Sequence, residues 1–204
     1  MGLTLDEIAI SHGTDKATVF SRTYAKPKGY TIHMAQFFEP WRDKAIRFVE
    51  IGVGGGESIR TWLDYFYKAH VIGIDNVRDT NIFNQPGKPF KRYTFVYGDQ
   101  TDETFWKCFA VDYGRDFDII VDDGAHMNDA TVISFNGLWP LLRSGGLYCI
   151  EDLATAYGGD PVFVKNGFPQ QINWLREMVD EMNQGRGDVS SIYFSKELAI
   201  LRKA

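Results

Sequence analysis

Arg47-Phe-Val-Glu-Ile-Gly-Val-Gly-Gly-Gly-Glu-Ser58 is the stretch of sequence that decides the fold. An apolar run breaks into Gly52, Gly54, Gly55 and Gly56 before a helical pattern begins. This order predicts a strand, a tight turn and the start of a helix. Glycine is needed where a backbone turns sharply against a ligand, because a Cβ would collide with the ligand or forbid positive φ. The stretch predicts a site for a nucleotide-like ligand; the alternative is a glycine-rich turn that binds nothing.

The charge of this turn distinguishes between cofactors. A dinucleotide fingerprint, G-x-G-x-x-G, places a pyrophosphate on the helix N-terminus. Here Glu57 replaces the third glycine, so an anion stands where the phosphates would lie. S-adenosylmethionine has no phosphate and carries a sulfonium cation, which is compatible with Glu50 at the strand end and Glu57 at the turn. The turn therefore favours S-adenosylmethionine over NAD or FAD.

Length and charge narrow the class of protein. The chain has 204 residues and a net charge of −5. This length suits one domain, residues 1–204, that buries about 70% of its unfolded surface. Lys and Arg form no dense block, so nucleic acid is not an expected partner. The sequence shows neither an apolar run of 18 residues nor an export signal, and we expect no membrane association. Cys108 and Cys149 lie in apolar segments, which predicts buried, reduced thiols in a cytoplasmic protein.

Strand and helix signals alternate from residue 47 onward, which predicts a mostly parallel sheet with helices on both faces. The expected strands are 47–53, 70–75, 93–98, 117–123 and 146–151, and the expected helices between them are 57–68, 101–113 and 129–143. A long loop is expected at 76–92. A helix at 170–184 and a two-stranded hairpin at 190–202 complete a seven-stranded α/β fold. Helices at 4–12 and 30–39 lie within an N-terminal helical cap, residues 1–45, that is expected to cover the ligand.

Every one of the five parallel strands ends in an acidic residue. Ligands of open α/β sheets bind beyond the carboxyl ends of the strands. Asp75 stands where a carboxylate accepts hydrogen bonds from both ribose hydroxyls, and Asp99 is placed to accept one from the adenine amino group. Acids after strands are also common as turn residues and N-caps, which is the alternative. The acids at the five strand ends are Glu50, Asp75, Asp99, Asp122 with Asp123, and Glu151 with Asp152.

The fourth and fifth strands bring three further carboxylates to this rim. Neighbouring strands lie about 4.8 Å apart, so Asp123, Glu151 and Asp152 would repel one another unless a cation lies between them. A hard divalent ion, most simply Mg²⁺, relieves that repulsion. Adjacent strand residues point to opposite faces, so Glu151 and Asp152 reach one ion only if the chain bends. The alternative is that these acids accept hydrogen bonds from backbone amides.

His126 follows Asp123 by three residues, on a loop that opens toward the same rim. Its ordinary pKa of about 6.5 lets a histidine take a proton at neutral pH. Beside a cation that polarises a hydroxyl, His126 is a candidate general base. The alternative is a solvated loop histidine.

Five segments together resemble a known family, the class I S-adenosylmethionine-dependent O-methyltransferases, and within it the metal-dependent sugar O-methyltransferases of macrolide and related glycoside biosynthesis. These segments are Glu50-Ile-Gly-Val-Gly-Gly-Gly56, Tyr97-Gly-Asp-Gln100, Val121-Asp-Asp-Gly-Ala-His126, Leu141-Leu-Arg-Ser-Gly-Gly-Leu-Tyr148 and Ile150-Glu-Asp-Leu153. His12-Gly-Thr-Asp-Lys16 also resembles a loop of that family. The family usually has Ser where Ala125 stands, and its larger macrolide-sugar members carry an additional N-terminal domain.

The resemblance implies a Rossmann-like class I methyltransferase fold and assigns roles to single residues. It implies that Asp123, Glu151 and Asp152 hold Mg²⁺ and that His126 removes a proton from the accepting hydroxyl. The expected cofactor site comprises Glu50, Gly52, Gly54, Gly56, Ser58, Asp75, Asp99, Gln100 and Asp122.

These observations together predict methyl transfer from S-adenosylmethionine to a sugar hydroxyl of a small-molecule or saccharide acceptor. Aromatic and histidine side chains are candidates for the acceptor pocket, namely Tyr24, Tyr30, His33 and Tyr157. A homo-oligomer is compatible with the sequence. The alternatives are a catechol-type acceptor, which Mg²⁺ also chelates, a cofactor-binding protein without catalysis, and a nicotinamide oxidoreductase, against which Glu57 argues.

Overall fold

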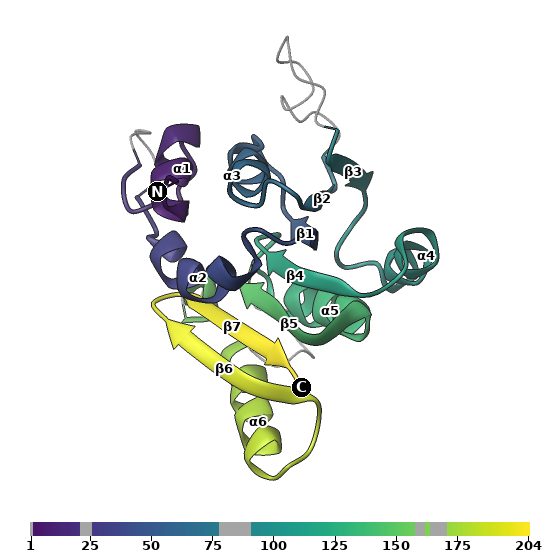
Figure 1. Cartoon of the computed structure of the whole chain (residues 1–204). Helices are drawn as coiled ribbons and strands as arrows, with labels where there is room; N and C mark the ends of the chain where they lie inside the picture. The colour runs from purple at the N-terminus through teal and green to yellow at the C-terminus, as the bar shows by residue number, and fades with distance from the viewer. Residues whose placement is uncertain (1, 21–25, 78–90, 158–161, 164–170) are drawn as a thin grey trace.

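The computed structural model describes residues 2–20, 26–77, 91–157, 162–163 and 171–204. Its centre is a seven-stranded sheet with the order β3-β2-β1-β4-β5-β7-β6 (Figure 1). The pairs from β3 through β5 are parallel, whereas β7 runs antiparallel to both β5 and β6. The strands are β1 (Arg47–Ile51), β2 (His70–Asp75), β3 (Tyr93–Tyr97), β4 (Phe117–Asp122), β5 (Leu142–Ile150), β6 (Val189–Ser195) and β7 (Leu198–Lys203). The predicted fold class is confirmed.

Helices cover both faces of this sheet. Those that precede β2 in the chain pack on one face, and α4, α5 and α6 pack on the other. The helices are α1 (Leu5–His12), α2 (Tyr30–Phe38), α3 (Glu57–Tyr65), α4 (Glu103–Tyr113), α5 (Asn128–Leu138) and α6 (Gln171–Asn183). Short 3₁₀ turns follow at η1 (Glu39–Trp41), η3 (Trp139–Leu141) and η4 (Leu153–Tyr157).

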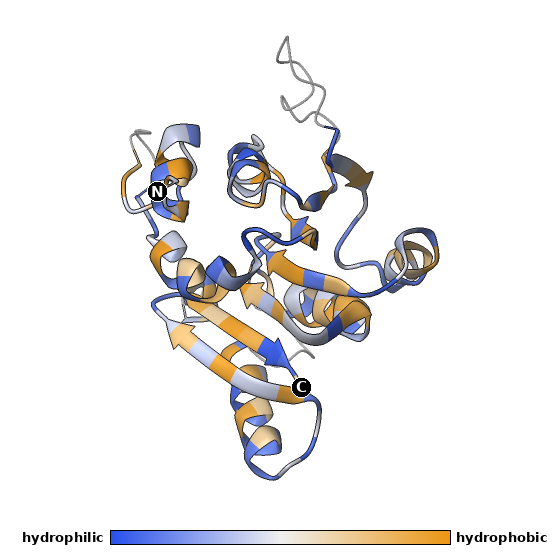
Figure 2. Ribbon diagram, in the orientation of Figure 1, coloured by the Kyte–Doolittle hydropathy of each residue, from blue (hydrophilic) through white to orange (hydrophobic). Residues whose placement is uncertain are grey.

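Both faces of the central strands are apolar, and the two cores follow from the alternation of side chains along each strand. In β1, Phe48 packs with α2 and α3, while its neighbour Val49 packs with α4 and α5. In β4, Ile119 lies in the first of these cores and its neighbour Ile120 in the second. Figure 2 shows the strands in mostly apolar colours and the connecting turns in polar ones. Polar side chains are therefore concentrated at the strand ends, where the site lies.

The N-terminal segment is part of the first core as well as a cover for the site. Thr4 and Glu7 form the expected capping box at the start of α1. Leu5 and Ile8 of α1, with Met34 and Phe38 of α2, are buried in the cluster that contains Phe48. Residues 13–20 and 26–29, between the two helices, lie at the carboxyl ends of the strands, where Lys16 contacts Asp123 and Lys28 contacts Asp152.

Two expectations from the sequence are wrong, and a third falls mostly on residues that the structure does not describe. The helix expected at 129–143 ends at Leu138, because Pro140 turns the chain into η3 and β5 then begins at Leu142. Cys108 is exposed, since α4 buries Trp106 and Phe109 and turns residue 108 outward; Cys149 is buried as expected. Most of the loop expected at 76–92 lies outside the described residues. No helix among the described residues is long and apolar enough to cross a membrane.

Candidate active site

The glycine turn between β1 and α3 forms the floor of the site. Gly52 has φ +85°, and its N–H donates to the carbonyl of Ile74 (2.9 Å). A Cβ added at Gly52 would lie 2.0 Å from the carbonyl oxygen of Asp123. Gly56 caps α3 with φ +79°. The turn thus needs glycine for two separate reasons, a left-handed backbone and close contact with the loop after β4.

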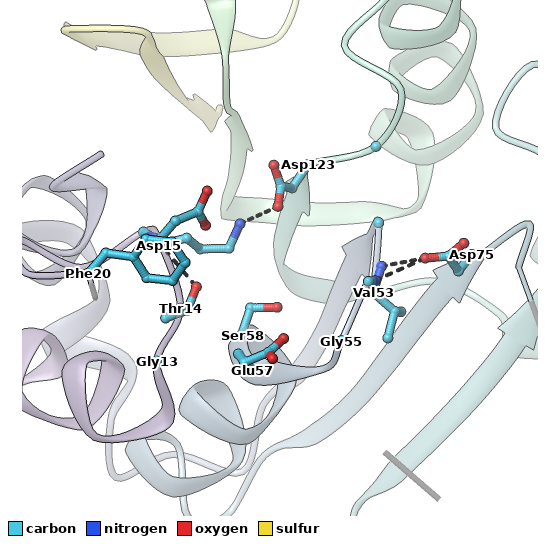
Figure 3. Close-up of a pocket in the computed structure, with 14 residues that line it drawn as sticks. Gly13, Thr14, Asp15, Phe20, Val53, Gly55, Glu57, Ser58, Asp75 and Asp123 are labelled. Carbon is cyan, nitrogen blue, oxygen red and sulfur yellow. Dashed lines mark hydrogen bonds and ion pairs between the residues drawn. The ribbon is translucent and has the colours of Figure 1, made fainter. Parts of the chain in front are cut away.

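Two adjoining cavities, of about 390 and 290 Å³, run along the carboxyl ends of the strands. Gly52, Asp75 and Gly124 line both, so the cavities are halves of one cleft. The first half lies between the glycine turn and the loop of residues 13–20, and Figure 3 shows Thr14 and Phe20 on one side and Ser58 and Asp75 on the other. The second half is lined by Asp99 and Gln100, together with the chain that follows β4.

The predicted cofactor residues at the ends of β2 and β3 surround this cleft. Asp75 Oδ2 accepts hydrogen bonds from the N–H groups of Val53 (2.8 Å) and Gly54 (3.1 Å), which Figure 3 shows as dashed lines. This carboxylate therefore ties the glycine turn to β2. Asp99 Oδ1 accepts from the N–H and hydroxyl of Thr101, each at 2.8 Å.

Gln100, which lines the second half of the cleft, and Asp122, which lies behind it, support the loop that carries His126. Gln100 Oε1 accepts from the N–H of Ala125 (2.6 Å). Asp122 is buried and accepts from the Ser134 hydroxyl (2.6 Å). Burial raises the pKa of Asp122, although its hydrogen bond from Ser134 acts in the opposite direction. Asp122 lines neither half of the cleft, so the structure gives it a supporting position.

Glu50 and Lys16 meet beneath the first half of the cleft. Glu50 is fully buried, accepts from the hydroxyl of Ser58 (2.8 Å) and lies 3.7 Å from Lys16 Nζ. Lys16 is 2% exposed and also donates to Glu151 Oε2 (2.7 Å) and to Asp123 Oδ2. Burial alone would lower the pKa of Lys16, but Asp123, Glu151 and Glu50 outweigh it and hold that pKa well above its usual value. Lys16 is therefore a buried ammonium surrounded by carboxylates.

Asp123, His126 and Asp152 form a second cluster on the outer side of Lys16. One potential ligand atom from each lies within 4.8 Å of the others. His126 Nε2 is 3.9 Å from Asp123 Oδ1 and 3.5 Å from Asp152 Oδ2. His126 and Asp152 both have left-handed backbones, with φ +55° and +56°. Strained backbone of this kind persists where the surrounding structure requires it.

The left-handed residue at Asp152 supplies the bend that three converging carboxylates need. Glu151 is buried, whereas Asp152 accepts from Tyr30 Oη (2.7 Å) and from Lys28 Nζ. Among the described residues, Glu151 Oε1 is buried without a hydrogen-bond partner. The oxygens of Asp123 and Asp152 that face His126 are the carboxylate donors that the structure brings together, and such oxygens suit a hard divalent cation such as Mg²⁺. Glu151 is not in this group, so its part in the predicted metal site stays a prediction.

The charges of these acids differ with their surroundings. Burial raises the pKa of Glu151 well above its ordinary value, against the effect of Lys16. Burial would also raise the pKa of Asp152, but the hydrogen bonds from Lys28 and Tyr30 outweigh it and the pKa is lowered. Asp152 is therefore held ionised at the mouth of the site.

The residues expected in the acceptor pocket are dispersed. Tyr30 is buried against Asp152, so its hydroxyl orients a carboxylate. The Nδ1 atom of His33 lies 2.7 Å from Tyr193 Oη on β6, away from the cleft lining. Tyr157 is 64% exposed and lines a separate groove with Leu153 and Glu197. Tyr24 lies outside the described residues.

Two lysines at this site carry roles that reasoning from the sequence missed. In the sequence, Lys16 stands out only as part of the loop His12-Gly-Thr-Asp-Lys16, and no pattern distinguishes Lys28. The signal that could have found them is the excess of acids at the strand ends. Buried carboxylates need cations nearby, and the only chain expected to cross that rim was the N-terminal segment.

Several known proteins are similar to this chain in sequence or in fold. No family model matches the chain. The 8-demethyl-8-alpha-L-rhamnosyl tetracenomycin-C 2'-O-methyltransferase of Streptomyces olivaceus is 32% identical over 96% of the chain. The demethylmacrocin O-methyltransferase of Streptomyces fradiae is 39% identical over 64% of the chain. The chain is similar to these O-methyltransferases. A solved structure, the MycE methyltransferase of the mycinamycin pathway in complex with Mg and SAH, superposes with a TM-score of 0.82 over the whole chain at 28% identity.

The chain spans only part of the length of the O-methyltransferases that it matches. It spans 53% and 34% of the length of the two curated relatives and 55% of the MycE chain. The part that matches MycE contains the seven-stranded sheet and every described site residue.

Proposed function

We propose that this chain transfers a methyl group from S-adenosylmethionine to a sugar hydroxyl of a glycoside, with Mg²⁺ held by Asp123, Glu151 and Asp152. One observation carries the proposal. Carboxylate oxygens of Asp123 and Asp152 surround His126 Nε2 directly beside a cleft that is built on a glycine turn. The curated relatives support it, since their names place the methyl group on sugars of tetracenomycin and macrolide-type compounds.

The cleft matches the shape that the cofactor needs. Its first half, beside Gly52 and Ser58, would take the methionine end, and its second half, beside Asp99, would take the adenosine end. Asp123 lines the first half and places a carboxylate near the position where the sulfonium would lie. The cleft thereby favours the charged methyl donor.

The acidic cluster would position the acceptor at the edge of the cleft. Bound there, Mg²⁺ supplies Lewis-acid chemistry that orients vicinal hydroxyls and lowers the pKa of one of them. Because hard cations prefer oxygen ligands, the three carboxylates are the proposed ligands and His126 remains available to take a proton at Nε2. The hydroxyl oxygen then attacks the methyl carbon, the carbon–sulfur bond breaks with its electrons left on sulfur, and S-adenosylhomocysteine is released.

Alignment of oxygen, carbon and sulfur is the main catalytic contribution that this geometry can make. His126 is held for its task by its left-handed backbone and by the hydrogen bond from Thr155 Oγ1 to its carbonyl (2.9 Å). A cytoplasmic location, proposed with this activity, is supported by the unpaired state of Cys108 and Cys149.

The test is a methyl-transfer assay with labelled S-adenosylmethionine and a panel of rhamnosyl polyketides, macrolide glycosides and catechols. We expect transfer to glycosides, loss of activity with EDTA and recovery with Mg²⁺. His126→Ala should lower kcat by about 10²–10⁴-fold while calorimetry shows unchanged binding of S-adenosylhomocysteine. Transfer to catechols alone would show that the acceptor is a catechol and not a sugar hydroxyl. Binding of S-adenosylhomocysteine with no transfer to any acceptor, and no effect of His126→Ala, would point to a non-catalytic binding protein.

A further inference from the structure

The N-terminal segment delivers two lysine ammonium groups to the three carboxylates of the proposed metal site. Lys16, from the loop after α1, donates to Asp123 Oδ2 and to Glu151 Oε2. Lys28, just before α2, donates to Asp152 Oδ1 and lies 3.3 Å from Glu197 Oε2. Lys16 is buried and Lys28 is partly exposed, with 29% of its side chain accessible. Both lysines therefore approach the carboxylates from the side of the N-terminal segment.

The contacts divide the two oxygens of each carboxylate in the same way. In Asp123, Glu151 and Asp152, one oxygen accepts a hydrogen bond from a lysine. The other oxygens of Asp123 and Asp152 face His126 Nε2, and that of Glu151 has no partner among the described residues. One lysine-bound oxygen and one open oxygen per carboxylate is the pattern expected when an outer layer of residues orients metal ligands.

The loop that carries Lys16 is itself fixed by the fold. The carbonyl of Lys16 accepts from the N–H of Thr31 (3.1 Å), and the N–H of Gly29 donates to the carbonyl of Ala17 (3.0 Å). These bonds join the loop to the start of α2. Since α2 is packed in the first core, the backbone of Lys16 is anchored to that core, and its Nζ is held by Asp123 and Glu151.

We propose that Lys16 and Lys28 are positioning residues, which hold one oxygen of each carboxylate so that the other oxygen is presented to the divalent ion. The inference rests on the proposed function, because it takes these carboxylates as metal ligands. Two effects of the lysines oppose each other. Their charge repels the ion, whereas their hydrogen bonds orient its ligands. In each of the three carboxylates the lysine binds the oxygen that does not face the proposed ion. This geometry points to orientation of the ligands as the larger effect.

The test measures binding of Mn²⁺ alone to the full chain, by electron paramagnetic resonance of the free ion. Removal of an outer-layer partner typically costs 10–100-fold in metal affinity, and we expect a loss in that range for Lys16→Met. Lys28→Met should lose about tenfold, at the lower end, because Tyr30 Oη still donates to the same oxygen of Asp152. Tyr30→Phe removes that second hydrogen bond without changing charge, and it should also weaken binding.

Lys196→Met is the matched control. Lys196 is 88% exposed and lies 3.7 Å from Glu197, so its removal changes the charge of this region without touching the three carboxylates. We expect its Mn²⁺ affinity to equal that of the unmodified chain. In the methyl-transfer assay, Lys16→Met should need 10–100-fold more Mg²⁺ for half-maximal rate and keep most of its kcat at saturating Mg²⁺. A general loss of structure would lower kcat at every Mg²⁺ concentration.

The outcomes separate this inference from the proposed function. If the unmodified chain binds no Mn²⁺, the proposed metal site fails and the inference with it. If the unmodified chain binds Mn²⁺ and both lysine variants bind it equally well or more tightly, the positioning role alone is overturned. Should Lys16→Met fail to fold, as judged by circular dichroism, Lys28→Met and Tyr30→Phe decide the question, since Lys28 is partly exposed and tyrosine to phenylalanine preserves packing.

Discussion

Glu50 shows how burial changes the chemistry of a single residue at this site. Its side chain is fully buried, and burial raises its pKa from about 4.5 to about 7, although Lys16 and the hydroxyl of Ser58 act in the opposite direction. A buried carboxylate of this kind makes stability depend on pH. The free energy of unfolding should therefore depend on whether the Glu50 carboxyl group is protonated.

The pH dependence that we predict follows from the direction of this shift. Between about pH 4.5 and 7 the folded state keeps a proton on Glu50 that the unfolded state has lost, so stability falls as the pH rises through the folded pKa. Glu50→Gln removes this dependence. Relative to the unmodified chain, its free energy of unfolding should increase by on the order of 3 kcal/mol from pH 4.5 to pH 8. Urea unfolding of the metal-free protein at both pH values measures this, and a constant difference would contradict it.

At this scale the sequence predicts acids better than their partners. Acids at the ends of parallel strands must meet at one rim, so the convergence of Asp123, Glu151 and Asp152 follows from topology alone. Lys16 lies 107 positions from Asp123 in the chain, and no periodicity records that contact. The contact of Tyr30 could not be predicted either. The sequence shows an aromatic residue at the start of a helix, but not that its hydroxyl donates to Asp152.

The glycine turn is the element in which local backbone and tertiary contact are most tightly joined. Gly52 and Gly54 both have positive φ, +85° and +49°. A Cβ at Gly52 would lie 2.0 Å from the carbonyl oxygen of Asp123, whereas a Cβ at Gly54 would meet nothing within 4 Å. The two positions therefore separate backbone strain from steric collision.

Replacing each glycine by alanine should show that difference. Gly54→Ala introduces only strain within the protein, at a cost of about 1–2 kcal/mol, and because Gly54 lines the first half of the cleft its Cβ should also weaken binding of S-adenosylhomocysteine. Gly52→Ala adds a collision that pushes the Asp123 loop away from the cleft, and we expect a larger loss of stability. Thermal unfolding of the two variants measures this difference. An equal loss of stability in both variants would show that Gly52 serves the backbone only.

The bounds of an element follow from the sequence where its apolar pattern ends at a clear signal. They do not where the apolar spacing continues past a residue that ends the element, such as a proline. The strand at His70–Asp75 has the bounds expected for it, because an apolar run there ends in an acid. The helix that starts at Asn128 ends five residues before its predicted end. Its apolar spacing continues through Trp139 and Leu142, but Pro140 cannot continue the hydrogen bonding and Leu142 already belongs to β5.

The acids of the site and the two lysines that bind them come from separate parts of the chain. The acids follow the strands, whereas Lys16 and Lys28 come from the N-terminal segment that crosses those strand ends. The sequence predicts this segment as a cover over the ligand. The structure adds that its helices complete the first core, where Phe38 packs edge-on against Phe48 and Trp62, with ring centroids 6.3 and 5.9 Å apart. Site assembly and folding therefore depend on the same segment.

Deletion of residues 1–45 should consequently abolish folding as well as the site. The deletion removes Leu5, Ile8, Tyr30, Met34, Phe38 and Trp41 from the first core. Each large apolar side chain contributes about 1.5–3 kcal/mol when buried. Their combined loss, on the order of 10 kcal/mol, is comparable to the whole stability of a domain of this size, about 5–15 kcal/mol. We expect the truncated chain to show no cooperative thermal transition by circular dichroism, whereas deletion of residues 1–2 should leave the transition unchanged. If the truncated chain melted cooperatively and still bound S-adenosylhomocysteine, the segment would be a detachable cover, and the sheet with α3 would be sufficient to form the cofactor cleft.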